Sequence, residues 1–231
     1  MLHVLRGFFI IALKFGRLSA EQRAQHTQVW SLQMLNCLGI KLIVIGQPAV
    51  AGPVMLVANH ISWLDITSLH AARFCRFVSK AELLTWPFIG KLASGVGTLF
   101  VERASRRDAM RVVNHMADQL RAGDVLAVFP EGTTSDGTAL LPFHANMFEA
   151  AIAANAPVQP VALQFIDAAS GKPSFAACYI NDDTLLGSVW RTLVTPGIAV
   201  QITFGKLQWA EGRSRRDWAK QVRADVESLR G

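Results

Sequence analysis

The stretch from Asn59 to Asp65 carries the residues best suited to chemistry, and it directly follows the apolar run Val54 to Ala58. It places the imidazole of His60 five residues before the carboxylate of Asp65. A neutral histidine removes a proton from a hydroxyl most effectively when an acid fixes its tautomer and stabilises the imidazolium that forms. The pair therefore has the makings of a general base with its orienting acid, acting on a substrate hydroxyl.

The same stretch also has a structural interpretation. Ser62 and Asp65 have the spacing of a helix capping box, and the helix dipole favours an acid in a first turn. If Ser62 is the N-cap, the helix begins at Trp63 and His60 lies just outside it. Taken alone, this stretch favours capping, because a histidine and an aspartate at this spacing often occur together by chance.

Two further predicted strands end in polar residues. The apolar run Val125 to Phe129 predicts a buried strand that leads into the loop Glu131-Gly132-Thr133. Residues 97–102 predict another strand, with Arg103 just beyond it. Sites in an open α/β sheet form beyond the carboxyl ends of the strands. We therefore expect these loops to line one pocket together with His60.

Four blocks of the sequence, in a fixed order, carry a family resemblance: Asn59-His60-x(4)-Asp65, Gly97-x-x-Phe100-x-x-Arg103, Phe129-Pro130-Glu131-Gly132-Thr133 and Pro157-Val158-x-Pro160-Val161. They resemble the motifs of the glycerolipid acyltransferase family, specifically the bacterial 1-acyl-sn-glycerol-3-phosphate O-acyltransferases. The resemblance covers roughly residues 41–205. One departure follows the third block, where many members have a basic residue and a glycine but this chain has His144-Ala145-Asn146.

The resemblance implies transfer of a fatty acyl group from a thioester, acyl-CoA or acyl carrier protein, to the free hydroxyl of a lysophospholipid. The first expected acceptor is 1-acylglycerol-3-phosphate, which gives phosphatidic acid. His60 is then the base that deprotonates the acceptor hydroxyl, and Asp65 orients it. The alkoxide attacks the thioester directly, so the resemblance implies no acyl-enzyme, and we expect neither a metal ion nor another cofactor.

The resemblance also implies the substrate contacts. Arg103 pairs with the acceptor phosphate, because a guanidinium is always charged and binds phosphate oxygens bidentately. Glu131 and the backbone of Gly132 and Thr133 shape the glycerol site, and Lys80 contacts phosphate or pantetheine. The alternatives are that Arg103 belongs to the basic helix surface that follows it, that Glu131 is an ordinary turn carboxylate, and that Lys80 is a solvated surface residue.

Two other functions stay open. The first is the same chemistry on another lysolipid such as lyso-ornithine lipid, because the block from His144 to Asn146 departs from the family pattern. The second is a catalytically silent, lipid-binding membrane adaptor, against which the presence of both His60 and Asp65 argues. A serine hydrolase is disfavoured, because the sequence has no Gly-x-Ser-x-Gly elbow.

The composition suits an enzyme with acidic partners. The 231 residues are 51% hydrophobic, which is ample for a core, and the net charge is +6. A basic chain favours anionic lipid, coenzyme A, acyl carrier protein or nucleic acid, and the lack of nucleic-acid motifs excludes the last from the expected partners. The three cysteines are far apart, which predicts no disulfide framework and no metal site and fits a reducing compartment.

The first 38 residues are predicted to contact a membrane. Their apolar run at 7–13 is interrupted by Lys14, whereas a spanning helix needs about 20 apolar residues. With Arg6, Lys14 and Arg17 around this run, residues 1–38 are expected to form helices that lie in the membrane interface, or alternatively to pack on the domain. Residues 39–231 are then the acyltransferase domain, held at the cytoplasmic face of the cell membrane.

Apolar periodicity predicts an α/β fold in which helices cover both faces of a mostly parallel central sheet, with an N-terminal interfacial helical segment. Helices are expected at 2–18, 21–38, 63–73, 81–92, 106–121, 144–154 and 214–229. Strands are expected at 41–46, 54–58, 97–102, 125–129, 158–165, 175–180 and 198–204.

Overall fold

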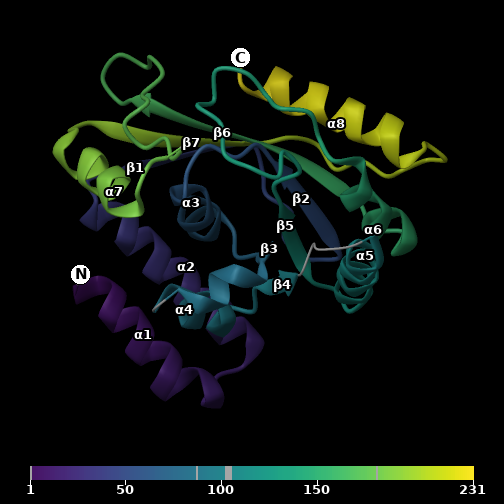
Figure 1. The fold of residues 1–231 in the computed structure, drawn as a ribbon, viewed down its shortest axis with the longest axis horizontal. Helices are drawn as coiled ribbons and strands as arrows, with labels where there is room; N and C mark the ends of the chain where they lie inside the picture. The colour runs from purple at the N-terminus through teal and green to yellow at the C-terminus, as the bar shows by residue number, and fades with distance from the viewer. Residues whose placement is uncertain (1, 87, 102–105, 181) are drawn as a thin grey trace.

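A mostly parallel sheet forms the centre of the molecule (Figure 1), as the sequence predicts. The computed structural model describes residues 2–86, 88–101, 106–180 and 182–231, and in these ranges the sheet has seven strands in the order β1-β7-β6-β2-β5-β3-β4. Only the β6–β7 pair is antiparallel within this part of the chain. The strands are β1 Lys41–Ile45, β2 Val54–Ala58, β3 Arg76–Lys80, β4 Leu99–Val101, β5 Val125–Val128, β6 Val158–Asp167 and β7 Ile198–Phe204.

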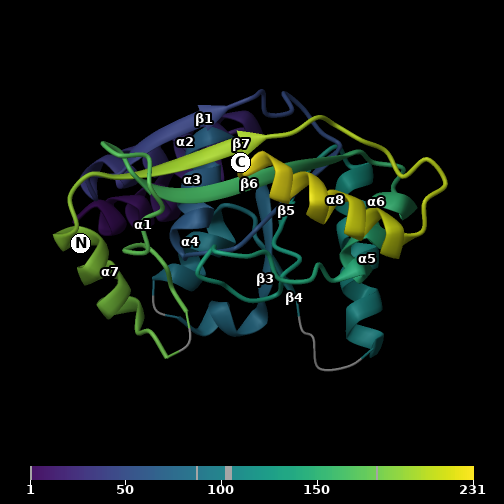
Figure 2. The same ribbon diagram turned by 90° about the horizontal axis from the view of Figure 1, so that it is seen from above.

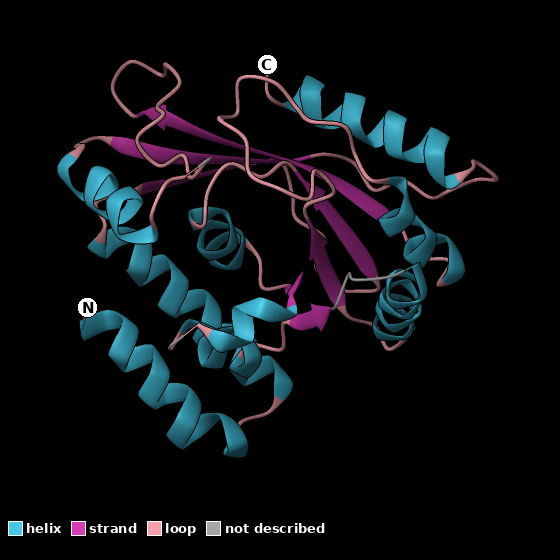
Figure 3. Cartoon of the chain, viewed as in Figure 1, coloured by secondary structure: helices cyan, strands magenta, loops and turns pink. Residues whose placement is uncertain are grey.

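Helices cover both faces of this sheet (Figure 3). The α-helices are α1 Leu2–Lys14, α2 Ala20–Cys37, α3 Leu64–Ala72, α4 Ile89–Gly95, α5 Arg106–Arg121, α6 Phe148–Ala153, α7 Leu185–Val194 and α8 Arg215–Leu229. Three short 3₁₀ turns accompany them in the described residues: η1 Phe15–Arg17, η2 Ala81–Thr85 and η3 Ala145–Met147. In both views α1, α2 and α7 lie at one end of the molecule and α5, α6 and α8 at the other (Figure 2).

The central strand β2 shows why the two faces need separate covers. All five of its residues are buried, as an apolar strand between two parallel neighbours should be. Leu56 and Ala58 pack with α2 and α3, whereas Met55 and Val57 pack with α5, α6 and α8. Alternate residues of one strand thus contribute to opposite cores, because successive side chains point to opposite faces.

The covering helices are amphipathic. Trp218, Val222 and Val226 form the buried stripe of α8. Helix α5 buries its own stripe at the same helical spacing, with Met116 and Leu120 fully enclosed. Hydrophobic burial of these stripes fixes the position of each helix on the sheet.

The N-terminal helices α1 and α2 lie against each other and against the domain. The rings of His3 and Trp30 stack with centroids 4.9 Å apart, and the Trp30 Nε1–H donates to the His3 carbonyl at 3.1 Å. A Cβ at Gly7 would lie 2.6 Å from that indole nitrogen, so glycine permits the close approach. Leu35 of α2 is fully buried in the core beside α3. None of the described helices is both long and apolar enough to cross a membrane.

Several predicted elements differ in the structure. The helices expected at 2–18 and 144–154 are each an α-helix with a 3₁₀ turn, namely α1 with η1 and α6 with η3. Residues 175–180 do not form the expected strand, because Cys178 N–H donates to Phe175 and Tyr179 N–H donates to the Ile61 carbonyl at 3.1 Å. The single helix expected at 81–92 is two elements, η2 and α4. Trp86 between them is extended, which is the conformation favoured for a residue that precedes a proline in the sequence.

Two elements were not predicted at all. Strand β3 lies between β5 and β4, but its five residues include two charges and give only a short apolar signal. Helix α7 carries its large apolar side chains on its outer side, since Leu186, Trp190 and Leu193 are exposed, whereas the residues it buries are Ser188 and Thr192. The helix therefore presents its apolar stripe outward, whereas sequence patterns assume that the apolar stripe of a helix faces the core.

Candidate active site

The neighbouring parallel strands β2, β5, β3 and β4 bring the predicted site residues to one edge of the sheet. His60 follows β2, Glu131 follows β5, and Lys80 is the last residue of β3. Because parallel strands end at the same edge, the three loops meet there, and Lys80 is exposed at that edge. Arg103 follows the end of β4 in the sequence but lies outside the described residues.

His60 and Asp65 form the pair that the sequence predicts. Asp65 Oδ2 lies 2.7 Å from His60 Nδ1 and also accepts the backbone N–H groups of Ile61 at 2.6 Å and Ser62 at 2.9 Å. The Asp65 side chain is fully buried, so three donors on one oxygen offset the cost of enclosing its charge. This bonding assigns the His60 proton to Nδ1 and leaves Nε2 as the basic nitrogen.

The capping role and the pairing with His60 involve the same carboxylate. Helix α3 begins at Leu64, one residue later than predicted, and Asp65 lies in its first turn. The N-cap is Trp63 and not Ser62 as predicted, and it makes no side-chain cap bond. Asp65 nevertheless accepts the Ser62 N–H, and Ser62 Oγ accepts from Leu64 N–H at 3.2 Å. Fixing the first turn therefore also fixes the carboxylate beside His60.

The loop after β5 surrounds His60 on three sides. The Phe129 ring stacks on the imidazole with centroids 4.0 Å apart and planes 9° apart. Glu131 Oε1 accepts the His60 backbone N–H at 2.9 Å, and Ser135 N–H donates to the His60 carbonyl at 2.9 Å. The ring and both backbone polar groups of His60 are thus held, while 20% of its side chain remains exposed.

Glu131 is enclosed beneath this loop. It is only 4% exposed, and its second oxygen, Oε2, accepts the Leu141 backbone N–H at 3.0 Å. Burial raises the pKa of Glu131 above its usual value, and the two amide donors, from His60 and Leu141, oppose that rise. Each carboxylate oxygen therefore has a backbone partner inside the protein.

Gly132 and His144 lie in contact at the opening of the loop. Gly132 has a φ of 74°, and a Cβ there would lie 3.1 Å from the His144 ring. His144 N–H donates to the Pro130 carbonyl at 2.8 Å, which fixes the exposed imidazole next to the glycine. Thr133 is exposed beside them. The block that departs from the family pattern thus adjoins the polar loop.

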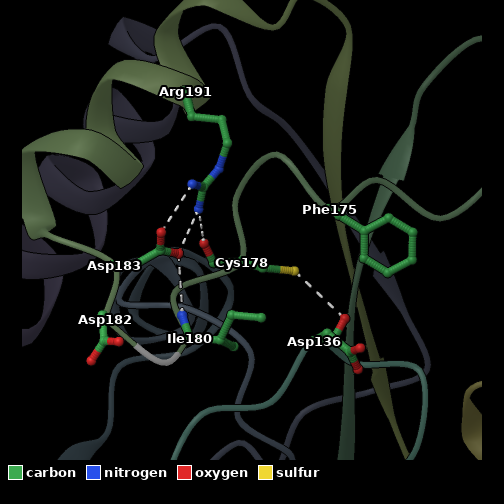
Figure 4. A pocket seen from close by; sticks show the side chains of 7 residues that line it. All are labelled: Asp136, Phe175, Cys178, Ile180, Asp182, Asp183 and Arg191. Atoms are coloured by element: carbon green, nitrogen blue, oxygen red, sulfur yellow. Dashed lines mark hydrogen bonds and ion pairs between the residues drawn. The ribbon is translucent and has the colours of Figure 1, made fainter.

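A pocket of about 660 Å³ lies between the loop after β5 and the segment that leads to α7 (Figure 4). Its lining residues are Asp136, Phe175, Cys178, Ile180, Asp182, Asp183 and Arg191. Arg191 donates to both carboxylate oxygens of Asp183, at 3.2 and 2.9 Å, and this bonding holds the pKa of Asp183 below its usual value. Because Tyr179 N–H donates to the Ile61 carbonyl, the wall of this pocket is tied to the segment that carries His60.

Comparison with known proteins assigns the chain to a family. Residues 41–164 match the family model described as Acyltransferase. A lyso-ornithine lipid O-acyltransferase of Pseudomonas aeruginosa is 36% identical over 204 residues, which is 88% of this chain and 78% of that protein. The chain belongs to the acyltransferase family. This confirms the resemblance seen in the four sequence blocks.

Other relatives agree with this assignment. A 1-acyl-sn-glycerol-3-phosphate acyltransferase of Neisseria gonorrhoeae is 36% identical over 165 residues, which is 69% of this acyltransferase and 63% of that protein. The solved structure of PlsC, the 1-acyl-sn-glycerophosphate (LPA) acyltransferase of Thermotoga maritima, superimposes with a TM-score of 0.69 at 21% identity. It covers 100% of this chain and 95% of that one, which shows a common fold. The acyltransferase acts on a lysolipid acceptor with an acyl donor.

Two neighbours of His60 in the acyltransferase were not predicted as site residues. Phe129 was expected only to end a strand, although an aromatic residue beside a polar loop at a strand end is a signal that could have identified it. Ser135 donates to the His60 carbonyl through its backbone N–H at 2.9 Å and, at 3.5 Å, through its Oγ, so its residue type gives only a weak signal. No group of three histidine, cysteine, aspartate or glutamate side chains within the described ranges is arranged to hold a metal ion.

Proposed function

We propose that this acyltransferase transfers a fatty acyl group from acyl-CoA or acyl carrier protein to the free hydroxyl of 1-acylglycerol-3-phosphate, giving phosphatidic acid in phospholipid synthesis. The observation that carries the proposal is the pair of His60 and Asp65, with Nδ1 and Oδ2 2.7 Å apart, next to the polar loop after β5. An imidazole held in one tautomer by a buried acid is suited to deprotonate a hydroxyl.

The reaction proceeds without a covalent enzyme intermediate. His60 Nε2 takes the proton of the acceptor hydroxyl while the oxygen attacks the thioester carbonyl carbon. The carbon–sulfur bond then breaks, and the thiolate receives the proton from the imidazolium. Asp65 stabilises the positive charge of His60 between these two transfers, as the aspartate of a serine hydrolase triad does.

Phosphate recognition is proposed for Arg103, which follows strand β4 by two residues. Its guanidinium suits the acceptor phosphate, because it is permanently charged and binds two oxygens at once. Gly132 and Thr133 are proposed to shape the glycerol site through their backbone. Lys80, exposed at the end of β3, is proposed to contact phosphate or pantetheine.

A second acceptor, lyso-ornithine lipid, is favoured by one specific observation. The lyso-ornithine lipid O-acyltransferase of P. aeruginosa matches 88% of this chain, whereas the N. gonorrhoeae relative matches 69%. The block from His144 to Asn146, which departs from the family pattern, adjoins Gly132. The third function considered, a silent membrane adaptor, would use Asp65 only to hold the first turn of α3 and would have no use for its bond to His60.

Membrane contact is proposed for the N-terminal helices, at the cytoplasmic face of the cell membrane. Leu2, Phe9 and Leu13 of α1 are all more than half exposed. Their spacing of seven and four residues places them on one face of the helix. Exposed apolar residues with basic residues around them suit a helix that lies in the interface of an anionic bilayer.

The acceptor is tested with purified protein in detergent or liposomes. Thiol release is measured with acyl-CoA and acyl carrier protein thioesters and three acceptors: 1-acylglycerol-3-phosphate, lyso-ornithine lipid and an uncharged lysolipid. We expect the highest kcat/KM with 1-acylglycerol-3-phosphate. A preference for lyso-ornithine lipid would replace the first acceptor with the second, and no thiol release by folded protein would favour the adaptor.

The role of Arg103 gives a sharper form of the same test. Arg103→Ala should lower kcat/KM by about tenfold or more for the phosphate-bearing acceptor, because a charged hydrogen bond contributes about 1.5–3 kcal/mol. Arg111→Ala is the matched control, since Arg111 is an exposed arginine of α5 that pairs with Asp108 at 3.4 Å. Equal losses with the uncharged lysolipid would contradict a phosphate contact.

A further inference from the structure

The Glu131 carboxylate lies directly beneath the backbone of His60. We propose that Glu131 is a positioning residue, which sets the backbone of His60 and with it the direction of the basic nitrogen, and that it does not contact the acceptor. This inference rests on the proposed function in one respect, namely that His60 is the base.

The first argument is that both carboxylate oxygens are already used. Oε1 accepts from His60 N–H at 2.9 Å and Oε2 from Leu141 N–H at 3.0 Å. An acceptor contact would need an accessible oxygen, but Glu131 is only 4% exposed. A carboxylate enclosed in this way is stabilised by its own donors and has little surface to offer a substrate hydroxyl.

The second argument is that Glu131 bonds to the backbone of the same residue that carries the reacting imidazole, and that this residue is held rigidly. The His60 N–H belongs to the residue whose Nδ1 is fixed by Asp65 and whose ring is stacked on Phe129. With Ser135 N–H on the carbonyl side, the backbone of His60 is held at both of its polar groups. Moving this backbone would turn the imidazole away from Asp65 or from the acceptor.

The third argument concerns the other end of the carboxylate. Leu141 begins the segment that continues to His144, the residue packed over Gly132. Glu131 thus joins the segment that carries the base to the segment that borders the acceptor side of the loop. One buried residue sets the separation of these two chains, which is the kind of fixed geometry that catalysis by proximity requires.

The experiment compares Glu131→Gln with wild type, using two acceptors and one donor. The carboxamide has one acceptor oxygen, so its NH₂ must face the N–H of either His60 or Leu141. We expect kcat to fall on the order of 100-fold, the effect of misplacing a catalytic group, with the acceptor KM changed less than about threefold. The loss should be the same for both acceptors. Hydrogen exchange should accelerate at the amide that faces the new NH₂, that of His60 or of Leu141, while exchange in β2 stays unchanged.

Controls keep the outcomes distinct. Glu149→Gln makes the same charge change at a partly exposed glutamate of α6, which pairs with Arg215 at 3.5 Å, and should leave kcat and His60 exchange unchanged. Glu131→Asp is a second variant in case Glu131→Gln does not fold. It keeps the charge but is one methylene too short to reach both amides, so kcat should again fall.

Two results would overturn the proposal. An increase in acceptor KM at unchanged kcat would show that Glu131 contacts the acceptor, and unchanged kcat with unchanged exchange would show that it positions nothing. If wild-type protein turns over no lysolipid, the proposed function fails, but the exchange measurement still reports whether Glu131 holds His60. Failure of the positioning role and failure of the reaction are therefore distinguishable.

Discussion

The segment from Asn59 to Asp65 and helix α1 differ in which side chains they bury and which they expose. In the segment from Asn59 to Asp65, most polar groups are buried and bonded: Asn59, for example, exchanges bonds of 3.0 and 2.7 Å with the backbone of Leu163. The exception among the described residues of this segment is Asp65 Oδ1, which is buried without a hydrogen-bond partner. In α1, large apolar side chains such as Phe9 and Leu13 are exposed. The difference fits the two proposed roles: a proton transfer needs fixed directions, which hydrogen bonds supply, whereas contact with lipid needs apolar area, which tolerates variation in position.

The largest effect on kcat is expected from a change at Asp65, which fixes the orientation of the His60 imidazole. Asp65→Asn should lower kcat on the order of a thousandfold, because the amide nitrogen would favour the wrong His60 tautomer and cannot stabilise an imidazolium. Steady-state thiol release measures the effect, with a thermal melt to establish that the variant is folded. If the folded variant keeps kcat within about threefold of wild type, the buried carboxylate is only a helix cap.

The next effect concerns a histidine in the same region with no such bonding. Burial lowers the pKa of His70 from 6.5 to about 4, and neither ring nitrogen has a hydrogen-bond partner in the described part of the chain. The unfolded chain therefore takes up a proton near pH 6.5 while the folded protein does not, so stability is lost as the pH falls from 6.5 towards 4.

His70→Phe should remove this loss, because the ring already packs between Phe74 and Phe77. Between pH 7 and pH 5 the free energy of unfolding of wild type should fall by about 2 kcal/mol more than that of the variant. Denaturant melts at the two pH values measure this difference. Parallel decreases in both proteins would mean that His70 is protonated as readily in the folded state as in the unfolded one.

The smallest effect is expected in α1, whose proposed membrane contact depends on the apolar area that it exposes. Phe9→Ser with Leu13→Ser should weaken binding to anionic vesicles by about tenfold or more, since each side chain contributes on the order of 1.5 kcal/mol when buried. Turnover of detergent-solubilised acceptor should stay unchanged. Val50→Ser is the matched control, because Val50 is an exposed apolar residue of a loop. Equal vesicle binding by the double variant and by wild type would remove α1 from the membrane contact.

Contacts between residues close in the sequence could be predicted, whereas contacts between distant residues could not. His60 and Asp65 are five residues apart, so their pairing was accessible from spacing and helix-start geometry. The bond from His60 to Glu131 spans 71 residues and depends on β2 lying next to β5, which no local pattern specifies. The family resemblance implied that Glu131 shapes the glycerol site. Its bonds to the backbone of His60 and Leu141 could be found only from the structure, because both depend on the fold.

The prediction of secondary structure also failed where the pattern of apolar residues does not identify the element. The β3 strand has a charged residue at each end, Arg76 and Lys80, and only a short apolar run between them, so its pattern does not identify a strand, although it lies in the sheet between β5 and β4. The irregular segment that holds Tyr179 against Ile61 was expected to be a strand because it contains apolar residues. In the structure these residues belong to a loop and not to a β-ladder. The strands with continuous apolar runs, β2 and β5, were predicted well because burial on both faces leaves little choice of residue.

The central claim is that His60 activates the acceptor directly, and pre-steady-state thiol release tests it. Wild type and His60→Ala are mixed with acyl donor, with and without 1-acylglycerol-3-phosphate. We expect wild type to release thiol only when acceptor is present, and His60→Ala to do so about a thousandfold more slowly. A stoichiometric burst of thiol without acceptor, or wild-type rates in His60→Ala, would contradict the claim.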